Sequence, residues 1–575
     1  ISDLSILNID NSGNNMIIMF QRNNIEQNLV NFREGDICIV YPHKDETDTV
    51  LNNQILKGSI VHINIETVEV SFRHKQKNIT LFKTHQLWAI EHDLLDSSYN
   101  NMYKSLFAFL KAPIHKRHIL LGLKSPQKSG IQSNEPYPEN IISQAIDAKD
   151  YFLIVGPPGT GKTSIFARRL IEEYYDQENT NIIVLAYTNR AVDELCEAIN
   201  SAFNCVDGRC DKYIRIGSEL SCSEQYRHRL LQRIAEKASN RSAIRKEIEQ
   251  TRIFVSTLAS INGKLELFNL KHFQVAIIDE ASQILEPQII GLLPKFDKFI
   301  MIGDHNQLST IVLQKKICSK INETGLIENG FADCRVSFFE RMLLTCKEQN
   351  WDQTYALLTV QGRMHTDISA FPSKYFYAGK LSFANEWQTD SLNLSSDPFK
   401  DIFHTIVAKE RIAFFSTHKI ASFSPSEKIN ENEAETIGSI IQAIWDIHNI
   451  NDTEFDLNKI GIIAPYRNQI AMIRHKLKQR DIPNIDNIMI DTVERFQGSQ
   501  RDIILLSFCV NKPYQLDFLA NMNHDGKVDR KLNVALTRAR QQLFLVGNSQ
   551  ILSKHFIYNS LLKFLKEKTY TLNNS

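Results

Sequence analysis

Up to about residue 90, the chain alternates hydrophobic and polar positions in short runs. Val61, Ile63 and Ile65 alternate with polar neighbours, and Gly35–Pro42 is a further apolar run with turn residues at both ends. This period is typical of half-buried strands, and several short strands separated by turns predict a small β-barrel. Apolar residues then recur at helical spacing over residues 94–111, which predicts a stalk-like helix after the barrel.

From Lys149 onward, the pattern changes to short, continuously apolar runs separated by helical stretches. Such runs are buried on both faces, so they predict parallel sheets covered by helices. The runs expected in a first core are 151–155, 181–187, 252–258, 274–279 and 298–304. Those expected in a second core are 460–465, 487–493, 502–508 and 542–548, with an amphipathic packing helix at 432–447. The predicted fold class is α/β with two tandem parallel-sheet cores.

The changes of pattern also suggest domain boundaries. We expect the barrel and stalk at residues 1–130, the first core at 131–330 and the second core at 331–575. Polar, Arg-rich helical sequence at 211–250 interrupts the first series and is expected as an insertion. Its arginines fit either a contact with a strand or partner, or a solvated helix face, which is the simpler interpretation.

Composition gives no evidence for a membrane protein and does not by itself identify a binding partner. Lys+Arg and Asp+Glu are both 66 in 575 residues, so any cationic surface for nucleic acid must be local. No apolar run approaches the ~20 residues of a membrane-spanning helix, so no membrane partner is expected. The chain opens with Ile1 and lacks a basic and apolar leader, so we expect a fragment or processed product, located in a bacterial cytoplasm or a nucleus.

The nine cysteines are scattered, with no CxxC pair and no recurring spacing. We interpret most of them as buried free thiols. Cys205, Cys210 and Cys222 form the one local group, but they lack the spacing and the paired histidine of a zinc site. We therefore predict no metal at this group.

A glycine-rich loop lies between a predicted strand and a predicted helix. Its residues are Gly156, Pro157, Pro158, Gly159, Thr160, Gly161, Lys162 and Thr163. In such a loop the backbone amides face nucleotide phosphates, the lysine reaches the β and γ oxygens, and the last hydroxyl ligates Mg²⁺. The sequence therefore predicts a site for ATP, or another nucleoside triphosphate, with Mg²⁺.

Two later strand ends supply polar groups that suit the same site. Asp279 and Glu280 end the fourth apolar run of the first core, where Asp279 would hold Mg²⁺ and Glu280 would polarise the attacking water. Gln307 follows the next run and is the candidate sensor of the γ-phosphate. Read singly, each is as easily a solvated strand end, but together with the loop they predict hydrolysis.

The order of eight sequence blocks resembles the superfamily 1 helicases of the 5′→3′ branch, which contains the nonsense-mediated-decay RNA helicase and the Okazaki-fragment nuclease-helicase. The blocks are GPPGTGKT at 156–163, LAYTNRAVDEL at 185–195, FVSTLAS at 254–260, DEASQ at 279–283, GDHNQL at 303–308, QGRMH at 361–365, IDTVERFQG at 490–498 and NVALTRAR at 533–540. The resemblance implies two RecA-like cores, with the barrel and stalk folded over a strand channel.

The resemblance also implies roles for further residues. Arg363 and Arg538 would reach the γ-phosphate from the second core, across a cleft from Lys162. The implied contacts with a nucleic-acid strand are Thr188, Asn189, Ser256, Thr257, Thr492, Gln497 and Gly498. Small hydroxyl and amide groups suit sugar and phosphate contacts, although each alone is more often a turn or cap residue.

Three positions depart from the family pattern. Gly362 stands where relatives carry a tyrosine that stacks on adenine, so we predict weak discrimination between bases unless Tyr137 or Tyr466 covers the base. Gln144, the candidate adenine reader, is closer to the loop than in most relatives. Gln500 replaces a common acid, which could alter the coupling between strand and nucleotide.

The predicted function is an ATP-dependent helicase or translocase that moves 5′→3′ along single-stranded nucleic acid. The polarity follows from the resemblance alone, and the wording of the DEASQ block favours DNA over RNA. One alternative is an RNA helicase or ribonucleoprotein remodeller with the same engine. Another is a nucleotide-regulated clamp that holds nucleic acid without processive unwinding.

Overall fold

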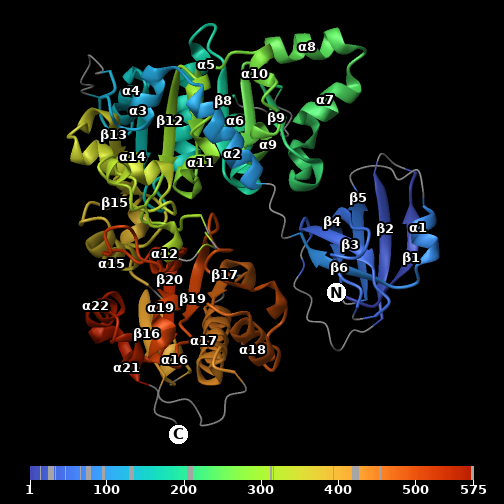
Figure 1. Cartoon of the computed structure of the whole chain (residues 1–575). Coiled ribbons are helices and arrows are strands. Elements are labelled where there is room, and N and C mark those ends of the chain that lie inside the picture. Colours follow the sequence, from blue (N-terminus) through green and yellow to red (C-terminus); the bar gives the residue numbers. More distant parts are fainter. Residues whose placement is uncertain are drawn as a thin grey trace. The chain divides into compact units, whose positions relative to one another are not determined.

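The structure is a computed structural model of the whole chain (Figure 1). It describes the chain except residues 13–14, 24–31, 33, 46, 65, 73–78, 94–97, 128–134, 204–210, 311, 313, 315, 393, 400, 418–425, 452–454 and 572–575. The described part forms two compact units. The first comprises Ile1–Tyr103 with Gly217–Arg233, and the second comprises Lys104–Ile216 with Ile234–Ser575.

The first unit contains the expected barrel. Its strands are β1 (Leu4–Asp10), β2 (Met16–Arg22), β3 (Ile37–Pro42), β4 (Leu56–Ile63), β5 (Thr67–Phe72) and β6 (Trp88–His92), with helix α1 (Thr80–Thr84) before β6. They close as β1-β2-β5-β4-β3-β6 with antiparallel pairing. Alternate residues point inward, and Phe20, Phe82 and Trp88 fill the centre. Ile65 lies outside the described residues.

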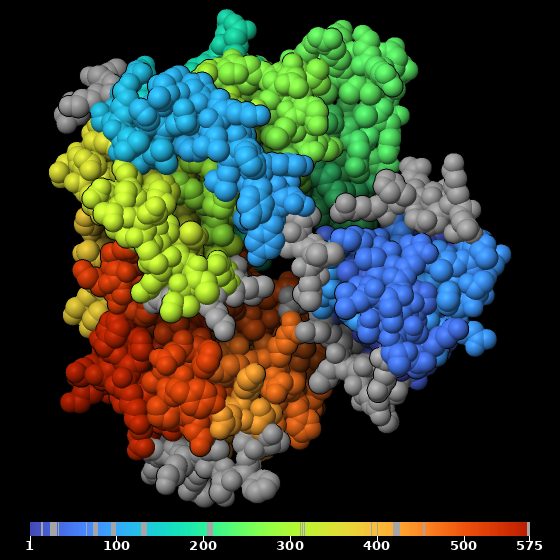
Figure 2. Space-filling view, in the orientation of Figure 1, coloured from blue at the N-terminus to red at the C-terminus, as the bar shows by residue number. Residues whose placement is uncertain are grey.

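The predicted stalk is α2 (Ser98–Leu110), followed by α3 (Ile114–Leu120). At Gly291, the position of a Cβ would collide with the backbone of Ser105, and the Gly291 amide donates to Ser105 Oγ at 3.0 Å. Lys116 Nζ donates to the carbonyls of Phe296 and Asp297 at 3.0 and 2.9 Å. The second half of α2 therefore lies directly on the first core, where it forms a blue ridge on the surface (Figure 2).

The first core is built on a parallel sheet. Its strands are β7 (Tyr151–Val155), β8 (Ile182–Ala186), β9 (Tyr213–Ile216), β10 (Ile253–Thr257), β11 (Val275–Ile278), β12 (Lys298–Gly303) and β13 (Tyr355–Leu357). The strand order is β13-β7-β12-β11-β8-β10-β9. The five strands predicted for this core all form, and every residue of β7, β8, β10, β11 and β12 is buried, as continuous apolar runs require.

Helices of the first core connect these strands or pack on the sheet. They are α4 (Glu139–Asp147), α5 (Arg168–Asp176), α6 (Asn189–Ala202), α8 (Arg241–Gln250), α9 (Leu258–Asn262), α10 (Leu267–Leu270), α11 (Glu286–Ile289), α12 (Lys316–Ser319), α13 (Thr324–Ile327) and α14 (Phe338–Glu348), and α7 (Leu231–Lys237) begins in the first unit. Helix α6, for example, lies against β8 and β10.

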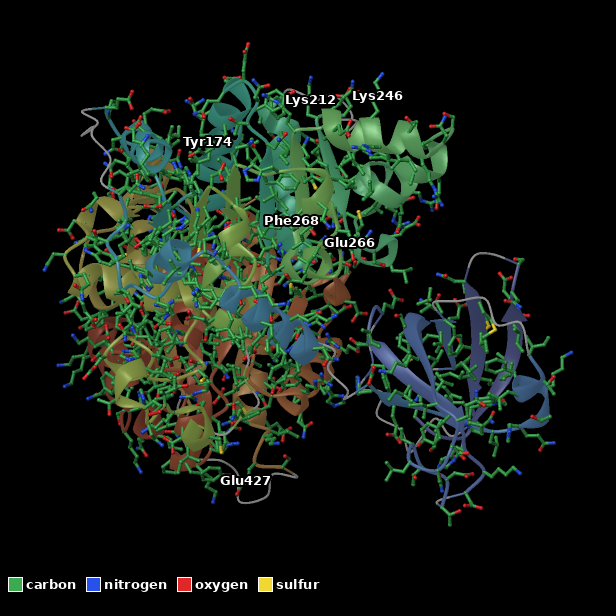
Figure 3. The ribbon with its side chains drawn as sticks, turned by 45° about the horizontal axis from the view of Figure 1, so that its top comes forward. Tyr174, Lys212, Lys246, Glu266, Phe268 and Glu427 are labelled. Atoms are coloured by element: carbon green, nitrogen blue, oxygen red, sulfur yellow. The ribbon has the colours of Figure 1, made fainter. Side chains whose placement is uncertain are left out.

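Three boundaries differ from the expectation. The first unit ends at Tyr103 and takes in Gly217–Arg233, so residues 104–127, which were expected in the barrel and stalk domain, belong to the unit that contains the cores. Strand β13 pairs with β7, so the first core extends beyond residue 330. Strand β9 pairs with β10 inside the stretch expected as a helical insertion. Both strands have only three or four residues, which is too short for periodicity to reveal. The rest of that stretch includes α8, where Arg241 and Arg245 are exposed, as is Lys246 (Figure 3). Arg229 is buried, so the solvated face expected for the arginines holds for α8 and not for the whole stretch.

The second core contains a smaller parallel sheet. Its strands are β16 (Ile412–Ser416), β17 (Ile460–Ile463), β18 (Met489–Asp491), β19 (Arg501–Ser507), β20 (Ala539–Gly547) and β21 (Thr569–Thr571), in the order β18-β17-β19-β20-β16-β21. Its helices are α15 (Thr366–Phe376), α16 (Ile402–Lys409), α17 (Glu431–Ile450), α18 (Arg467–Lys478), α19 (Leu516–Leu519), α20 (Arg530–Leu536), α21 (Ser549–Leu552) and α22 (Phe556–Phe564). Between the cores lies the two-stranded pair β14 (Val360–Gln361) and β15 (Ser382–Phe383).

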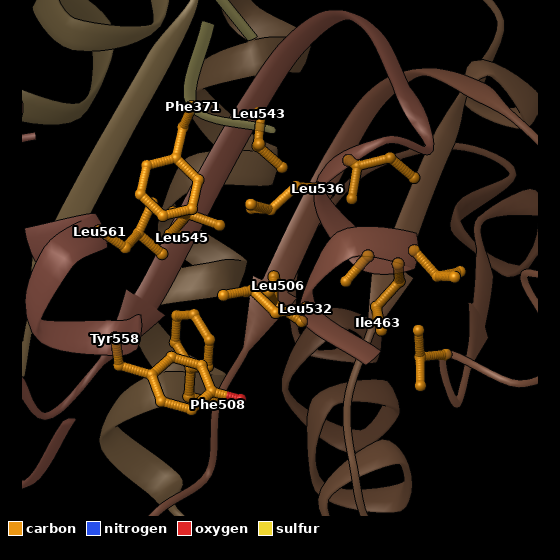
Figure 4. Close-up of a cluster of buried hydrophobic side chains, with 14 of the residues drawn as sticks. Phe371, Ile463, Leu506, Phe508, Leu532, Leu536, Leu543, Leu545, Tyr558 and Leu561 are labelled. Atoms are coloured by element: carbon orange, nitrogen blue, oxygen red, sulfur yellow. The ribbon is translucent and has the colours of Figure 1, made fainter. Parts of the chain in front are cut away.

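Alternate residues of the second sheet face two different hydrophobic clusters. Leu506 and Leu543 pack with α15, α20 and α22 on one face (Figure 4). Leu505 and Phe544 pack with α17 on the other. The sheet is therefore covered on both faces, as its continuous apolar strands predicted.

Two further predictions concern cysteines and membranes. The described cysteines are free thiols, of which Cys318 and Cys334 are exposed and the others buried. Cys205 and Cys210 lie outside the described residues, so the predicted absence of a metal there stays a prediction. Among the described residues, none of the helices combines the length and the apolar content needed to span a bilayer.

Candidate functional site

The glycine-rich loop, residues 156–163, joins the end of β7 to a π-helical turn, Lys162–Ala167, that continues as α5. Gly159 and Gly161 adopt φ angles of +78° and +75°, which disfavour any side chain. A Cβ at Gly159 would also lie 2.5 Å from the Cβ of Arg363. The loop is therefore closely packed, and its glycines are required by conformation and by space.

Lys162 extends back over this loop. Its Nζ donates to the carbonyl of Gly156 at 2.6 Å and to that of Pro157 at 3.3 Å. Burial lowers the pKa of Lys162 to about 8, although the carboxylates of Asp304 and Asp279 oppose that shift. The ammonium thus lies beside neutral oxygens, in a position where an anionic ligand would compete for it.

Asp279 and Glu280 follow β11 and face the loop. Thr163 Oγ1 donates to Asp279 Oδ2 at 2.5 Å, so one hydroxyl and one carboxylate oxygen lie side by side. Glu280 adopts a φ of +51°, an unusual conformation for a non-glycine residue that is common at functional sites. Burial and the charge of Asp279 raise the pKa of Glu280 to about 7, while a hydrogen bond from Thr188 Oγ1 at 3.1 Å opposes the shift.

Gln307 lies where the two cores meet. Its Nε2 donates to Asp304 Oδ2 at 2.8 Å, and its Oε1 accepts from Arg538 Nη2 at 3.4 Å. Arg538 also donates to the carbonyls of Val534 and Ser499 at 3.1 and 3.2 Å. Burial is the main cause that lowers the pKa of Arg538 well below its usual range. The predicted sensor and one predicted arginine are therefore in direct contact.

Arg363 lies on the segment that connects the two cores. The amide of Gly362 donates to the carbonyl of Gly159 at 2.9 Å, which attaches this segment to the phosphate loop. The Arg363 guanidinium donates to Gln500 Oε1 at 2.8 Å and to the Thr537 carbonyl at 3.4 Å. Burial lowers its pKa to about 10. Gln500 thus holds an arginine of the site.

The predicted catalytic and Mg²⁺-binding groups surround one cavity of about 880 Å³. Gly156 and Pro157 of the predicted loop are not among the residues that line it. Its lining includes Gly159, Thr160, Gly161, Lys162, Thr163, Asp279, Glu280, Gln307, Arg363, Gln497, Gly498, Gln500 and Arg538. Tyr137 and Gly362 also line it, so Tyr137 is the one of the two proposed aromatic covers that faces the cavity. Gln144 and Tyr466, both described, are not among the lining residues, so nothing in the cavity supports Gln144 as the reader of the base, which stays a prediction.

The expected strand contacts divide into two groups. Ser256 is fully buried and donates to the carbonyls of Ile216 and Thr257, while Thr257 Oγ1 caps α9. These two residues have structural roles here, because their hydroxyl groups are engaged by the backbone, and the expectation of strand contacts is corrected. Thr188 caps α6 and bonds Glu280.

Asn189, Thr492, Gln497 and Gly498 retain some exposure. Arg190, which sequence reasoning passed over, is exposed and donates to the Gly498 carbonyl at 3.0 Å. This hydrogen bond joins the sequence block at 185–195 in the first core to the block at 490–498 in the second core. Arg190 lies in the first turn of α6, and the sequence gives no signal for its role, since an exposed arginine is common on any helix.

Sequence reasoning also missed a polar network between the cores. Arg530 Nη2 donates to both carboxylate oxygens of Glu340 at 2.7 and 2.6 Å, and its Nε donates to the His305 carbonyl at 3.0 Å. Tyr377 bonds both Asp304 and Asn533. Asn533 and Arg530 stand in or near a resemblance block, but their partners lie 150 or more residues away, which no local pattern reveals.

Two family models, each described as an AAA domain, match the chain. One matches residues 133–243 and 222–315, and the other matches residues 334–550. These ranges contain the phosphate loop and both arginines.

Curated relatives and solved structures are also similar. The DNA replication ATP-dependent helicase/nuclease JHS1 of Arabidopsis thaliana is 27% identical over 94% of this chain and 39% of its own length. Regulator of nonsense transcripts 1 of Dictyostelium discoideum is 28% identical over 74% of this chain and 31% of its own length. Among solved structures, an Arterivirus nonstructural protein 10 (helicase) is 10% identical, with a TM-score of 0.37 over 90% of this chain and 78% of that one.

The chain spans about two fifths of the length of the helicase/nucleases that it matches. The ranges that match the two AAA domain models contain all eight sequence blocks. By sequence, the chain is therefore related to the superfamily 1 helicases.

Proposed function

We propose that the chain is an ATP-dependent motor that moves 5′→3′ along single-stranded nucleic acid and unwinds duplexes. The supporting observation is the single cavity in which the phosphate loop, two carboxylates and two arginines from two parallel-sheet cores converge. The related helicase/nucleases are named as ATP-dependent. The use of ATP by this chain is part of the proposal.

The residues of the cavity suit phosphoryl transfer. Lys162 would exchange the loop carbonyls for phosphate oxygens, and Arg363 and Arg538 would stabilise charge that develops on the γ-phosphate. Glu280 is partly buried and its pKa is raised to about 7, and it would orient the attacking water and accept its proton. These residues have catalytic roles in the proposal because they would touch the reacting phosphate or water.

The donor set also fits Mg²⁺. Thr163 Oγ1 and Asp279 Oδ2 are hard oxygen donors 2.5 Å apart, and Mg²⁺ commonly takes one or two protein oxygens together with phosphates and waters. In the described part of the chain, no group of three or more His, Cys, Asp or Glu residues could hold a metal by itself. Bound there, Mg²⁺ would neutralise phosphate charge, while Thr163 and Asp279 fix its place.

The contacts between the cores suggest how hydrolysis could cause movement. Arg538 and Gln307 come from different cores and touch each other, so a triphosphate between them would change how tightly the cores close. The candidates that retain some exposure, Asn189, Thr492, Gln497 and Gly498, would then grip the strand alternately. Because relatives include both a helicase/nuclease of DNA replication and a regulator of nonsense transcripts, DNA is proposed over RNA only on the wording of the sequence blocks.

The part of the cavity near Tyr137 and Gly362, where the base of a nucleotide would lie, predicts weak discrimination between ATP and GTP. Gly362 offers no ring, and Tyr137 is the aromatic residue that could cover a base. We expect ATP and GTP to be hydrolysed at rates within about ten-fold of each other, because stacking on one ring does not read the edge of a purine. Steady-state kinetics with both nucleotides would measure this. A preference for ATP of several hundred-fold would show that another group reads the base.

Lys162→Ala tests the proposed function directly. Loss of the Lys162 ammonium should lower strand-stimulated hydrolysis about a hundred-fold or more, since a preorganised charge at the phosphate would be gone. Lys554→Ala, an exposed lysine of the second core, is the matched control and should retain full turnover. Equal turnover by wild type and Lys162→Ala would contradict the mechanism.

Assays on matched DNA and RNA separate the alternatives. Unwinding of a 5′-tailed DNA duplex supports the proposal, whereas unwinding of RNA alone supports the ribonucleoprotein remodeller. Nucleotide-dependent binding of a strand without unwinding supports the clamp. The compartment, a nucleus or a bacterial cytoplasm, stays a prediction.

A further inference from the structure

Tyr377 lies at the end of α15 and reaches from the second core to the first. Its side chain is buried in the hydrophobic cluster shared by α15, α20 and α22. The hydroxyl donates to Asp304 Oδ2 at 2.7 Å and accepts from Asn533 Nδ2 at 2.7 Å. Burial and the charge of Asp304 raise the pKa of Tyr377 well above its usual range, so the hydroxyl keeps its proton and remains a donor.

Asp304 links Tyr377 to Gln307, because its carboxylate accepts hydrogen bonds from both side chains. Its Oδ2 accepts from Tyr377 and also from Gln307 Nε2 at 2.8 Å, while its Oδ1 accepts from the amide of Asn306 at 3.0 Å. An amide group has one donor end and one acceptor end. Because the carboxylate holds the donor end, the acceptor end, Oε1, must face Arg538.

The path closes on itself through α20. Asn533 Nδ2 donates to Tyr377 and to the carbonyl of Asn306, and Asn533 lies in α20, five residues before Arg538. Arg538 Nε donates to Val534 within the same segment. A ring of hydrogen bonds therefore runs from Arg538 through Gln307, Asp304, Tyr377 and Asn533 back to α20, and it crosses between the cores twice.

We propose that Tyr377 is a positioning residue for hydrolysis, which fixes Asp304 and thereby presents the acceptor end of Gln307 to Arg538. The inference rests on the proposed function of the same cavity. Tyr377 does not touch the phosphate position itself. Its hydroxyl instead makes the orientation of Gln307 depend on contact with the second core, so that the sensor and Arg538 are aligned only when the cores meet.

Tyr377→Phe removes one buried hydroxyl and keeps the ring. We expect kcat to fall about ten-fold while KM changes less than about two-fold, because the lost interaction orients groups in the transition state without binding substrate. Tyr558→Phe is the matched control, since Tyr558 is a buried tyrosine of the same core whose hydroxyl donates to the buried carboxylate of Asp529 at 2.6 Å. It should lose as much thermal stability as Tyr377→Phe and keep its kcat.

A double-variant cycle tests whether Tyr377 acts through Gln307. In a Gln307→Ala background, Tyr377→Phe should lower kcat no further. Equal and additive losses in both backgrounds would overturn the proposal, as would a Tyr558→Phe variant that loses kcat to the same extent. Either result would show that the buried hydroxyl contributes only to the stability of the core.

A crystal structure of Tyr377→Phe supplies a readout that does not require turnover. The Gln307 side-chain amide should either move away from Asp304 and Arg538 or rotate so that its oxygen and nitrogen exchange places. An unchanged Gln307 would overturn the proposal even if wild type proved inactive, whereas inactivity of wild type alone contradicts the proposed function. The two failures are therefore distinguishable.

Discussion

Arg530 and Arg538 stand at the two ends of one short segment of the second core, and both contact the first core, but their charges are held in opposite ways. Arg530 forms a buried ion pair with Glu340 of α14, with relative side-chain exposures of 9% and 3%. Arg538 donates to two carbonyls and one amide oxygen, all of them neutral. A buried guanidinium without a carboxylate is costly, so it is expected where an anionic ligand binds. The presence or absence of a carboxylate partner therefore separates the two residues: Arg530 joins the cores through its ion pair, whereas Arg538 is free to bind a phosphate.

Arg538→Met should have the strongest effect on turnover. We expect kcat to fall about a thousand-fold, as when an arginine that faces a transferring phosphoryl group is lost. The free energy of unfolding should change by less than about 1 kcal/mol, because the variant also removes a buried charge that only neutral oxygens stabilise. Hydrolysis kinetics and denaturant unfolding measure the two quantities. If Arg538→Met lost much stability but kept its turnover, Arg538 would have the same structural role as Arg530.

Glu340→Gln should have the opposite profile. The variant leaves the Arg530 charge buried and unpaired, so the free energy of unfolding should fall by about 3 kcal/mol. We expect kcat to change less than about ten-fold, since neither residue lines the cavity. Replacing both partners, Glu340→Leu with Arg530→Met, should recover most of the lost stability. If Glu340→Gln were as stable as wild type, the ion pair would not be what joins the cores.

The strands and the phosphate site were predictable because their signals are local. Continuous apolar runs such as 151–155 and 298–304 form strands at the expected places, and polar residues at their ends meet in one cavity. Lys162, Asp279, Glu280 and Gln307 follow from the parallel sheet, whose carboxyl ends share one edge.

The remaining features depend on contacts that no local pattern contains. Ser256 matches its block, but the edge strand β9, which was not predicted, supplies the carbonyl of Ile216 that binds its hydroxyl. Tyr377 reads as an ordinary core aromatic residue until Asp304, far away in sequence, is placed beside it. The roles of buried polar residues are set by such partners, so sequence spacing alone assigns them poorly.

Strand β13 gives Arg363 a different freedom of movement from that of Arg538. Leu357 pairs with Val155, the residue before the phosphate loop, and the loop carbonyl of Gly159 accepts from Gly362. Arg363 is thus tethered by a few residues of chain to the very strand that carries the loop. If the cores separate after hydrolysis, Arg538 would withdraw with α20, whereas the backbone of Arg363 would stay beside the loop while its guanidinium lost the bonds to Gln500 and Thr537. Opening would therefore remove one arginine from the site and detach the other only from its partners in the second core.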